Sequence, residues 1–329
     1  MIWTTWRRFR AQALTGLGAL LLLAVYLLVL GEQIRSGYRA DLARCGTAGG
    51  CAGALDSLTG DYGLQIDLLG YLLLAVPGAL GIFWGAPLVA RELEAGTHRL
   101  VWNQSVTRSR WLAAQLGLVG LTAVAVTGLG SALLSWAAGP LDQIGNDRFT
   151  PVLFAARGIA PLGYAAFAFA LGATLGLLIR RTVPAMALTL VLFAAVQILV
   201  PNLVRPHYSP AVRASVPLTA PAITDLTMIG SYGELQGLTV PGGPWVISTS
   251  TMLDAAGRPV GHSAWYQGCL NAGLTAMPTC LAAGHLHVDI TEQPADRYWT
   301  FQWYETALFA ALAALLTALC FARIRGRLG

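Results

Sequence analysis

Six long apolar stretches constrain this 329-residue chain more than any other feature of its sequence. A helix needs about 20 mostly apolar residues to cross a bilayer, and a helix satisfies its own backbone hydrogen bonds there. A soluble domain carries about 25% charged residues, whereas only 11% of this chain is charged. The sequence therefore predicts an all-α polytopic membrane protein with six transmembrane helices, at 11–31, 64–88, 111–138, 151–179, 182–204 and 303–323.

The arginines predict the orientation of these spans, because basic residues favour the cytoplasmic side. With the N-terminus inside, the inner segments hold twelve Arg and two acidic residues, and the outer segments hold eight Arg and twelve acidic residues. The asymmetry favours an N-in/C-in topology. The net charge of +5 then reports topology and does not indicate nucleic-acid binding.

Several enzyme classes are disfavoured by the residues that the chain lacks. All 21 basic residues are Arg, so there is no Lys for a P-loop or for Schiff-base chemistry. All five histidines lie outside the apolar stretches, which disfavours a metal or protease site within the bilayer. His285 and His287 lack an evident third metal ligand. We expect no catalytic residue, no metal site and no cofactor bound by this chain.

The loops divide the chain into three parts: 1–204, 205–302 and 303–329. The Gly-rich segment 32–63 is expected to be an outer connection. The segment 205–302 is long enough for a small extracytoplasmic cap between the fifth and sixth spans. Its many prolines predict an irregular first half, whereas 245–250 and 285–290 have strand-like sequences. We expect a small mixed α/β cap.

Four of the five cysteines lie in the segments expected outside, where disulfides persist. Proximity pairs Cys45 with Cys51 and Cys269 with Cys280. Four cysteines allow three connectivities, so cross-pairing between the loops remains open. Cys320 lies in the last span and is expected to be a packing residue.

The inner loop at about 89–110 is long and charged. The second span is expected to continue as helix to about Ala95, where Gly96 can end it and Thr97 can cap a short second helix. That helix would expose apolar side chains in the cytosol, which indicates that a partner protein covers them. The candidate coupling residues are Glu92, Glu94, Gly96, Thr97, Leu100, Val101, Trp102 and Arg108.

This loop resembles that of ABC-2 type transporter permeases. Those proteins carry a Glu-x-Gly-Thr element between spans two and three, and the loop ends in a Ser/Thr-Arg element just before span three. Here these elements are 94–97 and 105–108. The Arg-rich start at 3–10 resembles the connecting helix of that family, and the large segment before the last span is also typical. The stretch 297–306 resembles a subgroup common in actinobacteria. The resemblance covers the whole chain by layout, although sharp motifs cover only about a fifth of it.

The resemblance implies a multi-pass protein of a bacterial plasma membrane. It implies export of a hydrophobic or amphipathic compound by two permease subunits, in a homodimer or a related heterodimer. Two copies of a separate ABC ATPase subunit would bind ATP and Mg and drive the cycle. An ATPase-independent channel or a sensor/immunity protein is the alternative from another class, and an intramembrane enzyme is a more distant one.

A few polar residues fall within or beside the spans. Asp67, Arg157 and Glu305 could form an outer gate, or they could be a structural ion pair or snorkelling charges at the interface. Gln197 could face a substrate path or bond a neighbouring helix. Two Gly-xxx-Gly pairs, 81–85 and 172–176, allow close helix approach, for which packing within one subunit is the simpler interpretation.

Overall fold

The computed structural model describes residues 2–48, 51–94, 107–144, 147–240 and 242–325. The chain divides into two compact units, which are described separately. Unit 1 comprises Met1–Arg205 and Trp299–Gly329, and unit 2 comprises Pro206–Tyr298.

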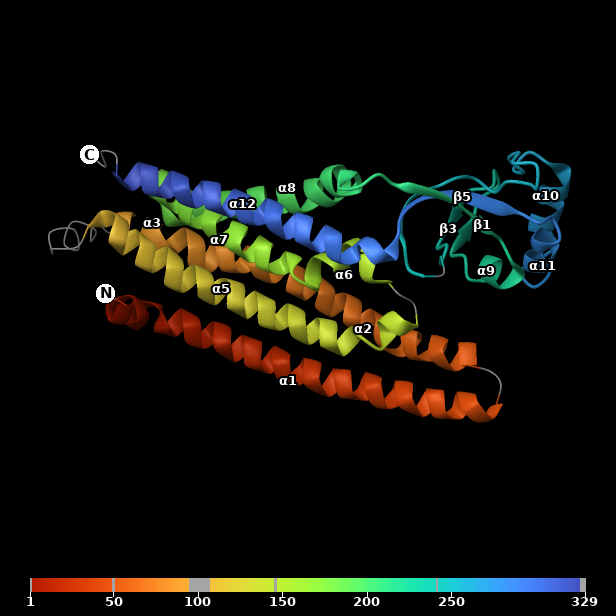
Figure 1. Ribbon diagram of the computed structural model, residues 1–329, viewed down its shortest axis with the longest axis horizontal. Helices are drawn as coiled ribbons and strands as arrows, with labels where there is room; N and C mark the ends of the chain where they lie inside the picture. The colour runs from red at the N-terminus through yellow and green to blue at the C-terminus, as the bar shows by residue number, and fades with distance from the viewer. Residues whose placement is uncertain (1, 49–50, 95–106, 145–146, 241, 326–329) are drawn as a thin grey trace. The chain divides into compact units, whose positions relative to one another are not determined.

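Unit 1 is a bundle of long helices (Figure 1). Among the described residues, six helices are long and apolar enough to cross a membrane, which confirms six candidate spans: Leu14–Ala43, Ser57–Glu94, Ser109–Ala138, Ala160–Ile179, Thr182–His207 and Ala295–Arg325. The bundle helices are α1 (Ile2–Ala48), α2 (Cys51–Leu80), α3 (Ala86–Glu94), α5 (Arg108–Ala138), α6 (Pro151–Ala156), α7 (Ala160–Ile179), α8 (Thr182–Leu199) and α12 (Tyr298–Arg325).

Short turns of other helical types connect or extend these helices. The π-helical turn η1 (Gly81–Gly85) joins α2 to α3, and a second one, η4 (Val200–Val204), extends α8. The 3-10 turns are η2 (Leu141–Gln143), η3 (Asp147–Phe149), η5 (Arg205–His207) and η6 (Ala295–Arg297). π turns are rare and cluster at functional sites.

Helix α7 is the centre of the bundle. About 72% of its most apolar stretch is buried, against 17–44% in the other five spans. The two Gly-xxx-Gly pairs bring it against the second span: a methyl group at Gly172 would lie 2.2 Å from the Gly81 carbonyl oxygen, and one at Gly176 would lie 2.4 Å from that of Ala86. Both pairs therefore serve packing within one chain, as the simpler interpretation held.

The prediction that 32–63 is a loop was wrong for most of that segment. Helix α1 continues to Ala48 and α2 begins at Cys51. The reason is close packing between the two helices, because a methyl group at Gly37 would lie 2.8 Å from the Leu58 side chain. Leu58 is 5% exposed, so Gly37 marks a tight contact between the two helices.

The prediction of one continuous helix over 151–179 was also wrong. The chain forms α6, breaks at Arg157, Gly158 and Ile159, and resumes as α7. Arg157 is extended and Gly158 has a φ of +74°, a left-handed value that favours glycine. Apolar composition is continuous across the break, which is why hydropathy does not reveal it.

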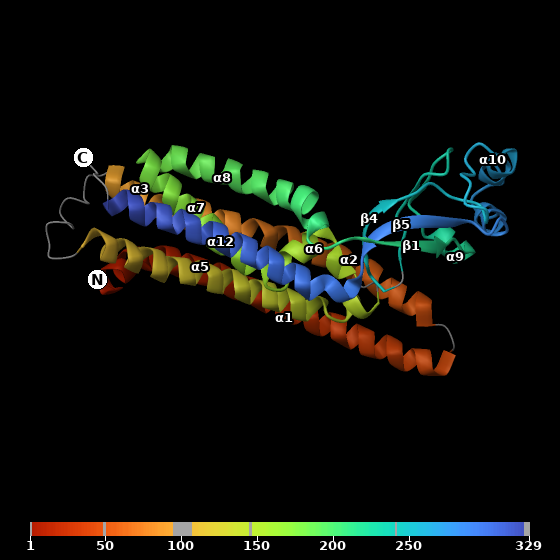
Figure 2. The ribbon, with the colours of Figure 1, turned by 45° about the horizontal axis from the view of Figure 1, so that its top comes forward.

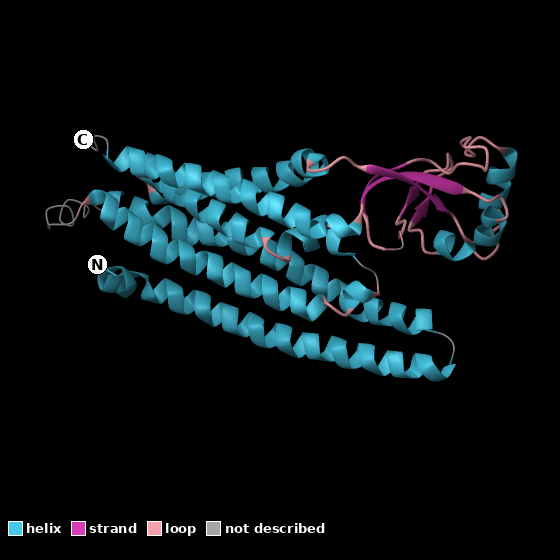
Figure 3. Cartoon of the chain, in the orientation of Figure 1, coloured by secondary structure: helices cyan, strands magenta, loops and turns pink. Residues whose placement is uncertain are grey.

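Unit 2 is a small α/β domain (Figure 3). Strands β1 (Val212–Pro217), β5 (His287–Gln293) and β4 (Trp245–Thr249) form an antiparallel sheet with β5 in the middle, and β2 (Met228–Ile229) pairs with β3 (Leu235–Gln236). Three short helices accompany them: α9 (Ala220–Thr224), α10 (Ala264–Leu270) and α11 (Met277–Ala282). The core of unit 2 is centred on Met252, Tyr266, Leu281, Val288 and Ile290.

The strands β4 and β5 confirm the two strand-like stretches, but β1 lies where the prolines predicted irregular chain. Strand β1 ends with Pro217 and lies at the edge of the sheet. An edge strand tolerates Pro because only one side of it must donate hydrogen bonds.

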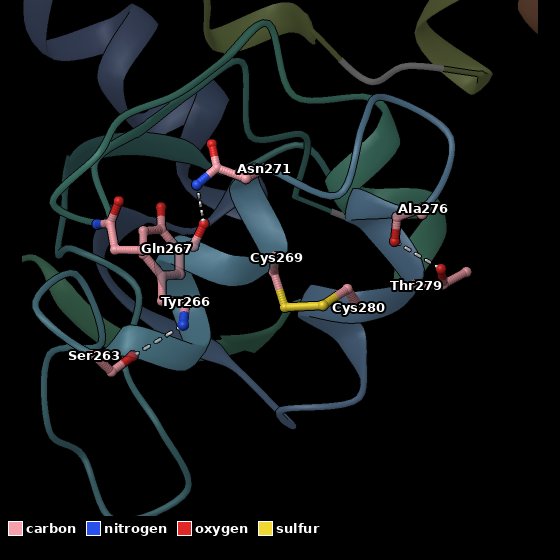
Figure 4. Close-up of a disulfide and its surroundings, with 8 residues drawn as sticks. All are labelled: Ser263, Tyr266, Gln267, Cys269, Asn271, Ala276, Thr279 and Cys280. Carbon is pink, nitrogen blue, oxygen red and sulfur yellow. Dashed lines mark hydrogen bonds between the residues drawn. A yellow bond between two sulfur atoms is a disulfide. The ribbon is translucent and has the colours of Figure 1, made fainter.

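The disulfide expected between Cys269 and Cys280 is present and joins α10 to α11, with 5.5 Å between the two Cα atoms (Figure 4). Tyr266, one turn before Cys269, donates from its hydroxyl to the Gly230 carbonyl at 2.7 Å. The side chains of Cys45 and Cys51 lie outside the described part of the structure. Cys320 is a buried free cysteine, 3.2 Å from the Thr174 hydroxyl.

Candidate functional site

A group of polar contacts surrounds the break between α6 and α7. Gln302 of α12 is fully buried there and bonds four backbone groups with one amide. Its Oε1 accepts from the N–H groups of Ile159 and Ala160, at 3.0 and 2.8 Å. Its Nε2 donates to the carbonyls of Phe154 and Arg157, at 2.9 and 3.1 Å. A break inside an apolar bundle is tolerated only where its freed backbone groups find such partners.

Helix α5 provides further hydrogen bonds to the backbone at this break. The Ser131 hydroxyl donates to the Gly158 carbonyl at 2.9 Å, and the Gly158 N–H donates to the Ser135 hydroxyl oxygen at 3.3 Å. A methyl group at Gly158 would lie 2.8 Å from the Gln302 amide. The break is thus a defined structural feature held by α5 and α12.

A buried ion pair lies at the end of α8. Arg205 donates from Nε and Nη2 to the two carboxylate oxygens of Glu305, at 2.8 and 2.7 Å. Both side chains are at most 1% exposed. The hydroxyl of buried Tyr164 also donates to Glu305, and the Arg205 guanidinium lies 4.2 Å from the centre of the Phe154 ring. The pair therefore links α8, α12, α7 and α6.

A second ion pair joins the break to the turn after α5. Arg157 donates from its two terminal nitrogens to the carboxylate of Asp142, at 2.8 and 2.5 Å, and both residues are buried. Arg148 lies 3.2 Å from the same carboxylate but is partly exposed. Bidentate pairing of this kind fixes the relative orientation of the two side chains and also adds to the interaction energy.

The predicted outer-gate residues therefore do not form one network. Arg157 pairs with Asp142, Glu305 pairs with Arg205, and Asp67 is exposed on α2 and belongs to neither pair. The sequence pattern detected Arg157 and Glu305 because charges stand out in apolar stretches. Their partners were missed because Arg205 and Asp142 border the spans and were assigned to loops.

At the opposite end of the bundle, Glu94 ends α3 and joins it to α8. The Glu94 carboxylate accepts from the Thr182 N–H at 3.1 Å and from the Thr182 hydroxyl at 2.7 Å. It thereby caps the first residue of α8, an arrangement that suits the positive end of a helix. Helix α7 reaches α8 through the tight turn Arg180–Arg181, with Arg180 at a φ of +58°.

The remaining predicted coupling residues are only partly described. Glu92 lies on α3, and Arg108 is the first residue of α5. Gly96, Thr97, Leu100, Val101 and Trp102 lie outside the described residues. The expected helical continuation of the second span is confirmed as far as Glu94.

Gln197 lies half-buried on α8, and its Nε2 has no hydrogen-bond partner among the described residues. It therefore does not bond a neighbouring helix within the described part of the chain. Gln302 is a further polar residue that sequence reasoning missed. Its only signal was an uncharged polar side chain close to Glu305 in the last span.

The paired and hydrogen-bonded side chains described above can hold the helices in one conformation and can take part in recognition. Within the described ranges, no group of three or more His, Cys, Asp or Glu side chains could hold a metal ion. Arg157, Asp142, Arg205 and Glu305 are buried in two ion pairs, and the Gln302 amide bonds the backbone of the helix break. Comparison with known families matches residues 17–205 to the family described as ABC-2 membrane transporter related. No curated protein and no solved structure matches the chain.

Proposed function

The chain belongs to the ABC-2 membrane transporter related family, and on that premise we propose that it is the permease subunit of an ATP-driven exporter. Members of this family are membrane components of ABC transporters, and they associate with an ABC ATPase. We propose that the cargo is a hydrophobic or amphipathic compound. The actinobacterial subgroup indicated by 297–306 belongs to the same proposal.

The observation that carries the proposal is the bond between Glu94 and Thr182. The segment 95–106 follows Glu94 in the sequence, and the Glu94 carboxylate is bonded to Thr182, the first residue of α8. A displacement of this segment by a docked ATPase would therefore reach α3 and α8 together. Helix α3 is also interlocked with α7 through Gly176, so one docking event would act on three helices.

The ion pair Arg205–Glu305 is the proposed outer closure of the pathway. It joins helices that come from distant parts of the chain, and a buried pair of this kind has two discrete states, formed or broken. In the proposed N-in/C-in orientation, the Glu94 end is cytoplasmic and unit 2 is extracytoplasmic. Helix α1 begins and α12 ends at the same end of unit 1, as an even number of crossings requires (Figure 1).

The complex would contain two permease subunits and two ATPase subunits. ATP and Mg would be bound by the partner ATPase. The test is co-purification of the chain from its native membrane, a search of the complex for an ABC ATPase, and measurement of substrate-stimulated ATP hydrolysis in vesicles. Trp102→Ala should remove an aromatic anchor, which at an interface hot spot costs about 2 kcal/mol or more, or roughly 30-fold in affinity.

Gly96→Val should also weaken coupling, because a β-branched residue opposes the positive φ that suits a helix C-cap. Arg258→Ala is the matched control, because Arg258 is exposed in unit 2 and pairs with Asp254. Normal complex formation and normal transport by both loop variants would contradict the proposed docking site. Absence of any ATPase in the purified complex would favour an ATPase-independent channel.

A further inference from the structure

An apolar groove of about 690 Å³ runs along unit 1 between three helices. Helix α7 contributes Phe169, and α5 and α12 provide the two walls. The courses of these three helices can be followed in Figure 2. Small residues such as Gly117 and Ala314 keep the groove open. A methyl group at Gly117 would meet no atom within 4 Å, so this position borders empty space.

The length of the groove matches one leaflet of a bilayer. On α5 its lining extends from Ala113 to Val124, which is about 16 Å at 1.5 Å per residue. A hydrocarbon core of about 30 Å gives each leaflet about 15 Å. A helix from a second copy would cross both leaflets, whereas the groove accommodates a chain confined to one.

Both walls of the groove lead to an arginine at the same end. Arg110 lies three residues before Ala113, and Arg325 lies four residues after Phe321, so each continues the groove-lining face of its helix. Helix α5 begins and α12 ends at this end of the bundle. Both arginines are exposed, and neither pairs with a carboxylate among the described residues.

We propose that this groove binds an anionic phospholipid, with an acyl chain along α7 and the phosphate between Arg110 and Arg325. The apolar lining selects a hydrocarbon chain, and the two cations select a negative headgroup over a zwitterionic one. Basic pockets between helices at a membrane surface recognise anionic lipids in this way. The occupant is a resident lipid of one leaflet and is distinct from the transported compound.

The test is photocrosslinking of the full chain in phosphatidylcholine vesicles. One preparation contains phosphatidylglycerol with a photoreactive acyl chain, and the other contains phosphatidylcholine with the same chain. Peptides covering 113–124 and 313–321 should be labelled by the phosphatidylglycerol probe well above the phosphatidylcholine probe. An arginine near an anionic surface contributes roughly a factor of five, so Arg325→Gln should lower this labelling about fivefold.

Matched variants distinguish lipid binding in the groove from attraction of anionic lipid to the general surface charge. Arg323→Gln is the control for Arg325→Gln, because Arg323 is exposed on the same helix about 200° around the axis from Phe321. Gly117→Leu should fill the groove and remove the labelling. Gly18→Leu makes the same change at an open position on α1 and should leave the labelling unchanged.

Three results would overturn the proposal. They are equal labelling by the two probes, equal effects of Arg323→Gln and Arg325→Gln, and unchanged labelling in Gly117→Leu. Disulfide-linked dimers formed by Gly117→Cys would place a second copy in the groove and would also overturn it. The arginine pair keeps the test decisive if Gly117→Leu does not fold.

Discussion

At the residue scale, Glu305 belongs to the more deeply buried of the two ion pairs described in the core of unit 1. It accepts from both Arg205 and Tyr164, and all three side chains are at most 1% exposed. Removing one partner of a buried ion pair leaves the other charge buried without a partner, which lowers the free energy of unfolding by about 3–5 kcal/mol. Replacing both by apolar groups of similar volume is often neutral for stability.

Glu305→Leu alone should therefore destabilise the protein strongly, by about 3 kcal/mol or more, because Arg205 would stay buried without its carboxylate. The double variant Arg205→Met/Glu305→Leu should recover much of that loss. Thermal unfolding in detergent measures both. If the double variant is as unstable as the single one, the ion pair is not the main interaction of these two residues.

The recovered double variant also separates stability from function. It should fold and still bind the ATPase, but it should lose the proposed outer closure and leak or fail in transport. Normal transport by a stable double variant would show that this pair is only structural.

The sequence identified individual charges but could not assign their partners. Arg157 and Glu305 stand out because each interrupts an apolar stretch. Asp142 belongs to a turn and Arg205 follows a span, and no local pattern distinguishes them from other loop charges. Gln302 carries no charge and lies beside aromatic residues, so only the backbone that it bonds reveals its role.

At the element scale, the break between α6 and α7 depends on one side chain from α12. Gln302→Leu keeps similar bulk but leaves four backbone groups, three buried and one partly buried, without their partner. Each orphaned group costs about 1–3 kcal/mol, so a loss of at least about 2 kcal/mol is expected. Hydrogen exchange at Ile159 and Ala160 should accelerate. Gln197→Leu is the control, because Gln197 Nε2 bonds no described residue.

An unchanged exchange rate at Ile159 and Ala160 in Gln302→Leu would mean that the amide does not hold the break. Equal destabilisation by Gln197→Leu would lead to the same conclusion.

Two glycines give substitutions with opposite expected signs: Gly172, in the contact between α7 and the second span, and Gly117, on α5 beside open space. Gly172→Ala would place a methyl group 2.2 Å from the Gly81 carbonyl oxygen, and such overpacking costs about 1–3 kcal/mol. Gly117→Ala meets open space and should stabilise α5 by up to about 1 kcal/mol through helix propensity. Unfolding midpoints in detergent measure both, and a stabilising Gly172→Ala would contradict the close contact.

The elements themselves were predictable to different degrees. Hydropathy located all six spans because crossing a bilayer requires apolar length. It missed the helical extension of α1 and α2, since polar helix and polar loop have similar composition. The π turn η1 and the break were also missed, because η1 packs against α7 and the break is bonded by α12, and local propensity encodes neither contact.

At the scale of the whole molecule, the orientation rests on the arginine asymmetry and can be tested directly. Cysteines introduced at Ser105 and Gly329 should react with an impermeant reagent only from the cytoplasm. A cysteine at Ser231, which is exposed in unit 2, should react only from outside. Labelling of the Ser105 variant in intact cells would overturn the topology, because one lost crossing inverts everything after it.

Arg205 and Glu305 also have a mechanical consequence for the two connections to unit 2. The chain leaves unit 1 after Arg205 and returns at Trp299, six residues before Glu305. A force applied to unit 2 would pull on both connections, and the Arg205–Glu305 pair joins them just inside the bundle. This ion pair would resist the applied force before α8 and α12 separated. Unit 2 could thus be stretched or unfolded while the membrane-spanning helices stayed in register.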